Sequence, residues 1–145
     1  MKYKYILFDL DGTITESGPG IMNSVEYALN KMNREVGDRD TLKKFIGPPL
    51  TESMEKYYGM SEEEALLGVK YYREYYAVKG IFENSVYEGL AETLESLKNE
   101  GYILAVATSK PEEYAKRIAD KFDFAKYFAG IYDIPLLQLQ ALFLS

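Results

Sequence analysis

The sequence of 145 residues contains no cysteine and no histidine. Without cysteine, the chain has no disulfides, no thiolate nucleophile and no cysteine-ligated zinc site. Without histidine, it has no Ser-His-Asp triad and no imidazole ligand for a metal. Carboxylates, hydroxyls, amines and the backbone therefore carry any chemistry, and a bound metal would take oxygen ligands, which favours Mg²⁺ or a similar hard cation.

Positive charge and long apolar runs are also scarce. The chain has 17 basic and 23 acidic residues, a formal net charge of −6, which disfavours a nucleic-acid partner. No apolar run reaches the length that spans a membrane, and the first residues lead into a short strand pattern rather than a signal peptide. We therefore expect a cytoplasmic protein that binds neither nucleic acid nor a membrane, and the missing cysteine agrees with a reducing compartment.

Three short segments rich in apolar residues are predicted to be strands, and the second of them has the nearly continuous apolar pattern of a parallel sheet. They span residues 3–8, 102–107 and 128–132. Between the first two, apolar residues recur at helical spacing, and Ser61 with Glu64 forms a capping box that predicts a helix start. This order of elements predicts an α/β fold with a Rossmann-like parallel sheet.

The helical segment interrupts the predicted sheet and divides the chain into two parts. We expect residues 1–14 and 86–145 to form the α/β core, and residues 15–85 to form an inserted helical domain. The length of the chain agrees with one core that carries such an insertion.

Polar residues follow two of the predicted strands at their carboxyl ends. The first group is Asp9-Leu10-Asp11-Gly12-Thr13 and the second is Thr108-Ser109-Lys110. In open parallel sheets, ligands bind beyond the carboxyl ends of the strands. We therefore expect the two groups to lie side by side and to form one site.

The residue types in these two groups suit phosphoryl transfer. Asp9 can attack phosphorus and form an aspartyl-phosphate, and Asp11 can protonate the leaving oxygen and then deprotonate a water. The backbone amides of Gly12 and Thr13 are expected to bind an anion. The Thr108 hydroxyl is placed to donate to a phosphate oxygen.

Simpler interpretations of the same residues stay open at this point. The first group also has the composition of an ordinary turn, although two aspartates directly after a buried strand are more specific than a lone Asp-Gly. Thr108 and Ser109 have the residue types of a helix cap. Lys110 is interpreted equally well as a phosphate contact or as a solvated lysine at a helix start.

Two motifs of the sequence resemble those of a known family. Residues 8–17, Phe8-Asp9-Leu10-Asp11-Gly12-Thr13-Ile14-Thr15-Glu16-Ser17, resemble the first motif of the haloacid dehalogenase (HAD) superfamily. Residues 106–111 resemble its second motif, and the intervening helices resemble the cap of the phosphoglycolate phosphatase-like branch. Residues 45–50 resemble the substrate-facing loop of that cap, and the whole resemblance covers residues 1–133.

The resemblance implies a Mg²⁺-dependent phosphomonoester hydrolase with an incomplete HAD-like sheet and an inserted helical cap. It makes Asp9 the nucleophile and Asp11 the acid and base, with Mg²⁺ bound by an Asp9 carboxylate oxygen and the Asp11 backbone carbonyl. The expected substrate-binding residues are Gly12, Thr13, Thr108, Ser109 and Lys110. The implied substrate is a small phosphorylated metabolite, and phosphoglycolate, a nucleoside monophosphate and a sugar phosphate all remain open.

The resemblance also implies two later motifs, a lysine after the third strand and acidic Mg²⁺ ligands after a fourth. Residues 134–145 contain neither a lysine nor a carboxylate side chain. We therefore expect a shortened family member that binds Mg²⁺ weakly and turns over slowly, if at all. The alternative is a non-catalytic fragment that binds a phosphorylated ligand or a partner.

The last residues of the sequence are apolar, which is unusual for an exposed terminus. Without a fourth strand beside it, the first predicted strand is expected to present an apolar edge. Residues 136–144 either cover that edge, or represent an ending foreign to the family, or drive self-association. The sequence leaves these alternatives open.

Overall fold

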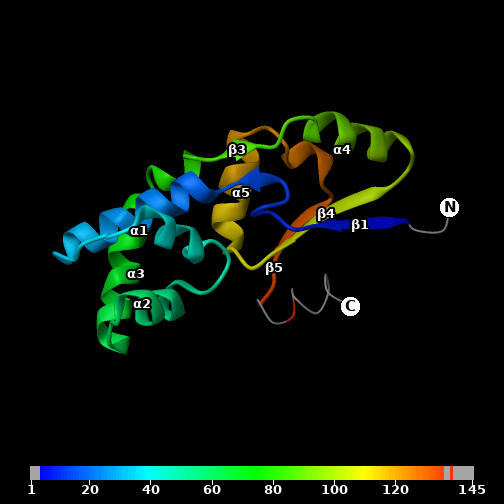
Figure 1. The fold of residues 1–145 in the computed structure, drawn as a ribbon. Coiled ribbons are helices and arrows are strands. Elements are labelled where there is room, and N and C mark those ends of the chain that lie inside the picture. The colour runs from blue at the N-terminus through cyan, green and yellow to red at the C-terminus, as the bar shows by residue number, and fades with distance from the viewer. Residues whose placement is uncertain (1–3, 136–137, 139–145) are drawn as a thin grey trace. The chain divides into compact units, whose positions relative to one another are not determined.

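The computed structural model describes residues 4–135 and residue 138, and the chain divides into two compact units (Figure 1). The core unit comprises residues 1–16 and 85–145, and the inserted unit comprises residues 17–84. No helix in the described part of the chain is both long and apolar enough to cross a membrane.

The core unit contains a parallel sheet, which confirms the predicted α/β fold. Its strands, in the spatial order β1-β4-β5, are β1 (Tyr5–Phe8), β4 (Ile103–Thr108) and β5 (Gly130–Asp133). Phe8 of β1 lies opposite Val106, and Thr108 at the end of β4 lies opposite Asp133. The carboxyl ends of all three strands therefore meet at one edge of the sheet.

The two faces of this sheet differ in how they are covered. Leu104 and Val106 point to a buried face, where α4 (Leu90–Asn99) packs beside β4, and α5 (Glu112–Lys121) packs beside β5. On the opposite face Tyr5, Leu7 and Tyr132 are 66%, 43% and 57% exposed. Within residues 4–135 and 138, β1 pairs only with β4, so it presents the apolar edge that the sequence analysis expected.

A second, very small sheet connects the places where the chain leaves and returns to the core unit. β2 (Thr15–Glu16) pairs antiparallel with β3 (Ser85–Val86), with Thr15 opposite Val86. Strands of two residues are too short to show an alternating apolar pattern, and for this reason the sequence did not predict them.

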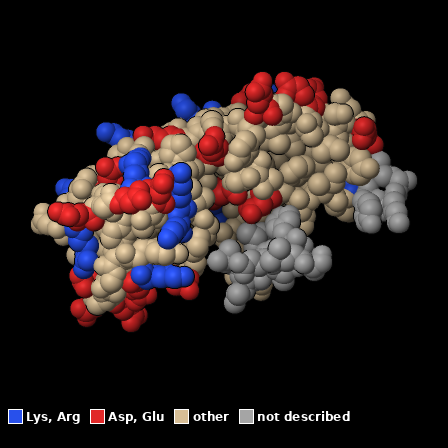
Figure 2. Space-filling view, in the orientation of Figure 1, with Lys and Arg blue, Asp and Glu red and all other residues tan. Residues whose placement is uncertain are grey.

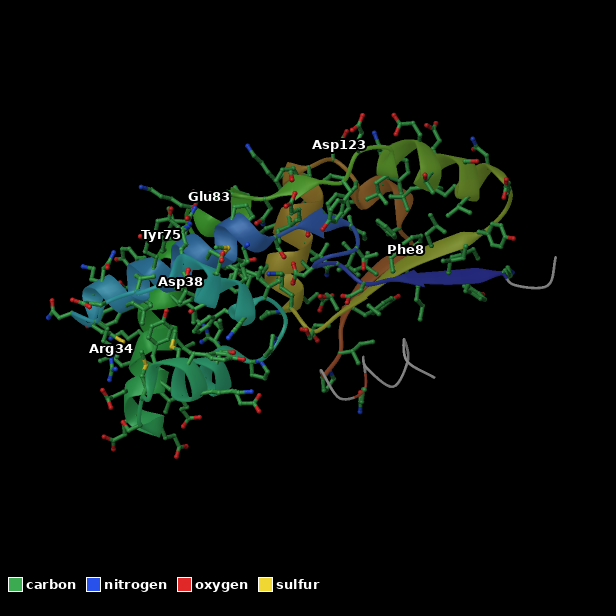
Figure 3. The ribbon with its side chains drawn as sticks, viewed as in Figure 1. Phe8, Arg34, Asp38, Tyr75, Glu83 and Asp123 are labelled. Atoms are coloured by element: carbon green, nitrogen blue, oxygen red, sulfur yellow. The ribbon has the colours of Figure 1, made fainter. Side chains whose placement is uncertain are left out.

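The inserted unit is helical throughout its regular elements. These are α1 (Gly18–Lys31), η1 (Arg39–Phe45), α2 (Leu50–Tyr58), α3 (Glu62–Tyr76) and η2 (Gly80–Phe82), the two η elements being 3₁₀ helices. The predicted capping box is confirmed, because the amide of Glu64 donates to Ser61 Oγ over 3.2 Å and the amide of Ser61 donates to Glu64 Oε1 over 3.1 Å. Arg34, which follows α1, donates to the carbonyl of Tyr58 and pairs with Glu64, so it links three helices (Figure 3).

The core unit also contains a short helical element that is not part of the sheet. A short 3₁₀ helix, η3 (Ala125–Tyr127), connects α5 to β5. Figure 2 shows acidic side chains gathered over α4, in agreement with the net negative charge of the chain. The alternatives for the apolar residues 136–144 concern residues that, apart from Gln138, lie outside the described part of the chain.

Candidate active site

The loop after β1 is a tight turn held by its own backbone. The carbonyl of Leu10 accepts hydrogen bonds from the amides of Thr13, Ile14 and Thr15 over 2.9–3.2 Å. Gly12 has a φ of +82°, a conformation that favours glycine, and its amide donates to the Thr15 carbonyl over 2.8 Å. The amides of Gly12 and Thr13 are thus used inside the turn, which corrects the expectation that they are directed at an anion.

This turn is anchored in the core unit at both of its ends. Leu10 and Ile14 are 1% and 0% exposed, so the loop is fixed by two buried side chains. Phe8, the residue before Asp9, packs edge-to-face on Phe128 with ring centroids 5.9 Å apart (Figure 3). The position of Asp9 is therefore set by packing on the strand side and by hydrogen bonds on the loop side.

Asp9 is half-buried at the carboxyl end of β1. Its Oδ1 accepts a hydrogen bond from the amide of Leu10 over 2.7 Å, which orients the carboxylate. Burial raises the pKa of Asp9; the hydrogen bond from Leu10 opposes this rise, and the negative charge of Asp11 adds to it. A partly buried carboxylate forms fewer hydrogen bonds to water. Ionisable groups with shifted pKa values are often found at functional sites.

Asp11 and Lys110 are far apart in the sequence but lie close together in the fold. Lys110 Nζ lies 3.5 Å from Asp11 Oδ2, and the two side chains are 8% and 22% exposed. The interpretation of Lys110 as a solvated lysine is therefore wrong. Its contact with a phosphate remains a prediction.

The residues after β4 divide into a buried and an exposed part. Thr108 is buried, and its Oγ1 accepts a hydrogen bond from the amide of Lys110 over 3.1 Å, which holds the turn that carries the lysine. Ser109 is exposed on the same turn. Neither residue caps α5, which has no side-chain cap from its own N-terminal segment.

The cap of α5 comes instead from Asp133, which the sequence analysis did not identify. Asp133 Oδ2 accepts a hydrogen bond from the amide of Glu112 over 3.0 Å. An acidic residue at the end of the third predicted strand was the available signal, because the carboxyl ends of parallel strands face the start of the following helix. Asp133 therefore places a third carboxylate at this sheet edge, already engaged with the helix.

The donor atoms at this edge suit a hard cation. Asp11 Oδ1 is buried and has no hydrogen-bond partner among residues 4–135 and 138. In the same residues no cluster of three or more acidic side chains could hold a metal, which leaves the carboxylates of Asp9 and Asp11. Since Mg²⁺ is commonly held by one or two carboxylates together with water and substrate phosphate, these residues fit Mg²⁺ as a small donor set.

Fold and site together define an α/β domain with a carboxylate loop after its first strand and a threonine and a lysine after the neighbouring strand. The model of the haloacid dehalogenase-like hydrolase family matches residues 6–135. The chain belongs to this family, as the resemblance of its two motifs predicted.

Relatives of known name cover most of this chain but less of their own length. A 5'-nucleotidase of Pseudomonas aeruginosa is 44% identical over 136 residues, which are 94% of this chain and 62% of that protein. The tyrosine-protein kinase PtkA of Mycobacterium tuberculosis is 39% identical over 127 residues, covering 87% and 43% of the two chains. A phosphoglycolate phosphatase of Aquifex aeolicus is 33% identical over 125 residues, covering 86% and 58%.

One solved structure also matches most of this chain over a smaller share of its own length. The crystal structure of a predicted phosphatase from Clostridium acetobutylicum superposes with a TM-score of 0.84 at 49% identity, over 92% of this chain and 62% of that one. The chain thus spans between about two fifths and three fifths of the lengths of these four proteins.

Proposed function

We propose that this chain carries the nucleophile site of a Mg²⁺-dependent phosphomonoester hydrolase that acts through an aspartyl-phosphate. The observation that supports this most directly is the half-buried carboxylate of Asp9 beside the Asp11–Lys110 ion pair, at the carboxyl ends of two neighbouring strands. Membership of the haloacid dehalogenase-like hydrolases supports the same class of reaction.

In the proposed first step, a carboxylate oxygen of Asp9 attacks the phosphorus of the ester. The bond between phosphorus and the ester oxygen breaks, and Asp11, which takes up a proton when the substrate dianion binds, transfers that proton to the departing oxygen. The hydrogen bond from Leu10 to Asp9 Oδ1 fixes the carboxylate for this attack.

In the second step, Asp11 accepts a proton from a water that attacks the phosphorus of the aspartyl-phosphate. The bond between phosphorus and the Asp9 oxygen breaks, which releases inorganic phosphate and regenerates the Asp9 carboxylate. The sum of the two steps consumes one ester and one water and yields one alcohol and one phosphate.

The residues after β4 bind the phosphoryl group in this proposal. The Thr108 hydroxyl accepts from the amide of Lys110, so its own proton is available for a phosphoryl oxygen. The ammonium of Lys110 supplies positive charge at the same edge of the sheet. Gly12 and Thr13 shape the turn rather than donate to the ligand.

An Asp9 carboxylate oxygen and the Asp11 backbone carbonyl would hold Mg²⁺, so that Asp11 contributes its main chain to the ion and its carboxyl group to proton transfer. When bound, the ion supplies charge neutralisation for the phosphoryl oxygens. A small phosphorylated metabolite is the proposed substrate class, and relatives named 5'-nucleotidase and phosphoglycolate phosphatase support it without selecting one ester. The kinase relative supports phosphoryl chemistry in general.

Hydrolysis of p-nitrophenyl phosphate with Mg²⁺ tests this proposal, with the chain compared with its Asp9→Asn variant. The matched control is Asp120→Asn, which changes an exposed aspartate on α5. We expect activity in the chain and in the control, and its loss in Asp9→Asn. Activity that survives Asp9→Asn excludes Asp9 as the nucleophile.

The second candidate function is a non-catalytic domain that binds a phosphorylated ligand or a partner. It is favoured by the small number of acidic groups available for a metal in the described residues. Absence of hydrolysis in the chain and in both variants, together with measurable binding of inorganic phosphate, would support this candidate over the enzyme.

A further inference from the structure

Lys110 is buried to an extent that lysines rarely reach. Its side chain is 8% exposed, whereas Lys116, which pairs with Glu112 on α5 over 2.8 Å, is 58% exposed. Burying an ammonium group is unfavourable unless an opposite charge compensates it. The burial of Lys110 therefore depends on the acidic groups at the edge of the sheet.

The turn that carries Lys110 directs it to Asp11. The hydrogen bond from the Lys110 amide to Thr108 Oγ1 fixes the backbone, and the ammonium nitrogen then lies 3.5 Å from Asp11 Oδ2. This distance exceeds the 2.7–2.9 Å that is typical of a charge-assisted hydrogen bond, so the contact is an ion pair without a tight hydrogen bond. Asp11 keeps a second oxygen, Oδ1, that has no hydrogen-bond partner within the described residues.

The formal charges around this ion pair remain negative. Asp9 and Asp11 contribute two negative charges and Lys110 one positive charge. The third carboxylate at this edge, Asp133, accepts a hydrogen bond from the uncharged amide of Glu112 and keeps its own negative charge. Lys110 thus neutralises part of the charge that a divalent cation would otherwise neutralise.

We infer that Lys110 is a built-in counter-ion of Asp11 that opposes the binding of a divalent cation and allows the chain to bind a phosphoryl anion without metal. The same positive charge repels Mg²⁺ from the carboxylates and attracts a dianion to the edge of the sheet. This inference rests on the proposed phosphoryl site but not on turnover. In this inference the positive charge of Lys110 acts on both ligands, against the cation and in favour of the anion.

Removal of the charge should therefore change the two affinities in opposite directions. In Lys110→Gln we expect Mg²⁺ to bind about fivefold more tightly, because one nearby positive charge is lost. We expect inorganic phosphate, measured in EDTA, to bind roughly tenfold more weakly, because a charged hydrogen-bond donor is lost. Lys110→Arg should keep both affinities close to those of the unchanged chain, since it retains the charge.

Titration calorimetry of the whole chain measures these affinities, with MgCl₂ alone in one arm and inorganic phosphate in EDTA in another. A third arm with phenyl phosphate in EDTA distinguishes a site for phosphate esters from one for free phosphate only. Lys116→Gln is the matched control, because it removes a lysine paired with a carboxylate at an exposed position. Neither affinity should change in this control.

A second variant, Asp11→Asn, tests the inference even if Lys110→Gln does not fold. Asp11→Asn removes the negative charge of Asp11 and keeps the positive charge of Lys110, so we expect metal-free phosphate binding to strengthen severalfold. Far-ultraviolet circular dichroism establishes which variants remain folded.

Opposite shifts in Lys110→Gln, or stronger phosphate binding in Asp11→Asn, support the inference. Unchanged Mg²⁺ affinity in folded Lys110→Gln, no metal-free phosphate binding in the unchanged chain, or weaker phosphate binding in Asp11→Asn overturns it. Failure of p-nitrophenyl phosphate hydrolysis rejects only the proposed enzyme, since these binding measurements do not depend on turnover.

Discussion

Two glycines lie close together in the inserted unit, and this contact predicts whether the substitution of one of them raises or lowers stability. Gly20 lies in α1 and faces Gly80 of η2, and the carbonyl of Gly20 accepts from Ser24 Oγ over 2.7 Å. A Cβ at position 20 would overlap the backbone carbonyl of Gly80 and lie 2.7 Å from Asn84 Oδ1. The change Gly20→Ala therefore forces α1 and η2 apart.

Two opposing effects determine the magnitude. Alanine in a helix is about 1 kcal/mol more favourable than glycine, so helix propensity alone predicts stabilisation. Overpacking of a close contact costs about 1–3 kcal/mol, and here the obstructing atom belongs to the backbone and has no rotamer to change. Because Ile81 beside Gly80 is fully buried, movement of η2 also loosens the core, and we expect a net loss of about 1–2 kcal/mol.

Urea unfolding followed by circular dichroism measures this loss. The matched control is Gly68→Ala in α3, where the added Cβ would meet Met54 Sδ at 2.5 Å. Methionine is flexible and can move aside, so the control should stay within about 1 kcal/mol of the unchanged chain. If Gly20→Ala unfolds at the same urea concentration as the unchanged chain, or at a higher one, the reasoning from the backbone overlap is refuted.

Three further predictions concern the core unit. Because the folded chain raises the pKa of Asp9, its ionised form is penalised, so Asp9→Asn should stabilise the chain at pH 7. That gain should shrink as the pH falls through the raised pKa of Asp9 and vanish below about pH 4, where the carboxyl is protonated in the folded and the unfolded chain; thermal unfolding across pH checks it. Asp133→Ala should cost about 1 kcal/mol in urea unfolding by removing the acceptor for the Glu112 amide, and Asp133→Asn should cost less; equal losses would contradict a capping role. We propose that residues 136–145 promote self-association, so sedimentation should show oligomers of the whole chain and a monomer for a chain ending at residue 135; a whole chain that stays monomeric at every concentration would exclude this.

Features that depend on neighbouring residues could be predicted from the sequence. The apolar runs predicted a parallel sheet, and the structure confirms it in β1, β4 and β5. The capping box of Ser61 and Glu64 is confirmed because both of its hydrogen bonds close within one helical turn. The two aspartates after the first strand identified the family for the same reason, since the motif is continuous along the chain.

Features that depend on which strands become neighbours required the tertiary structure. Lys110 follows one strand and Asp11 follows another, and their pairing in the sheet buries a lysine for which the sequence left a solvated position and a phosphate contact equally open. The capping of α5 by Asp133 likewise joins residues from different elements. The amides of Gly12 and Thr13 turn inward because the carbonyls of Leu10 and Thr15 lie within reach, a matter of loop geometry that residue types do not specify. The sequence by itself thus determined the chemical groups and the family, and the packing of the strands decided which groups meet and which are already engaged.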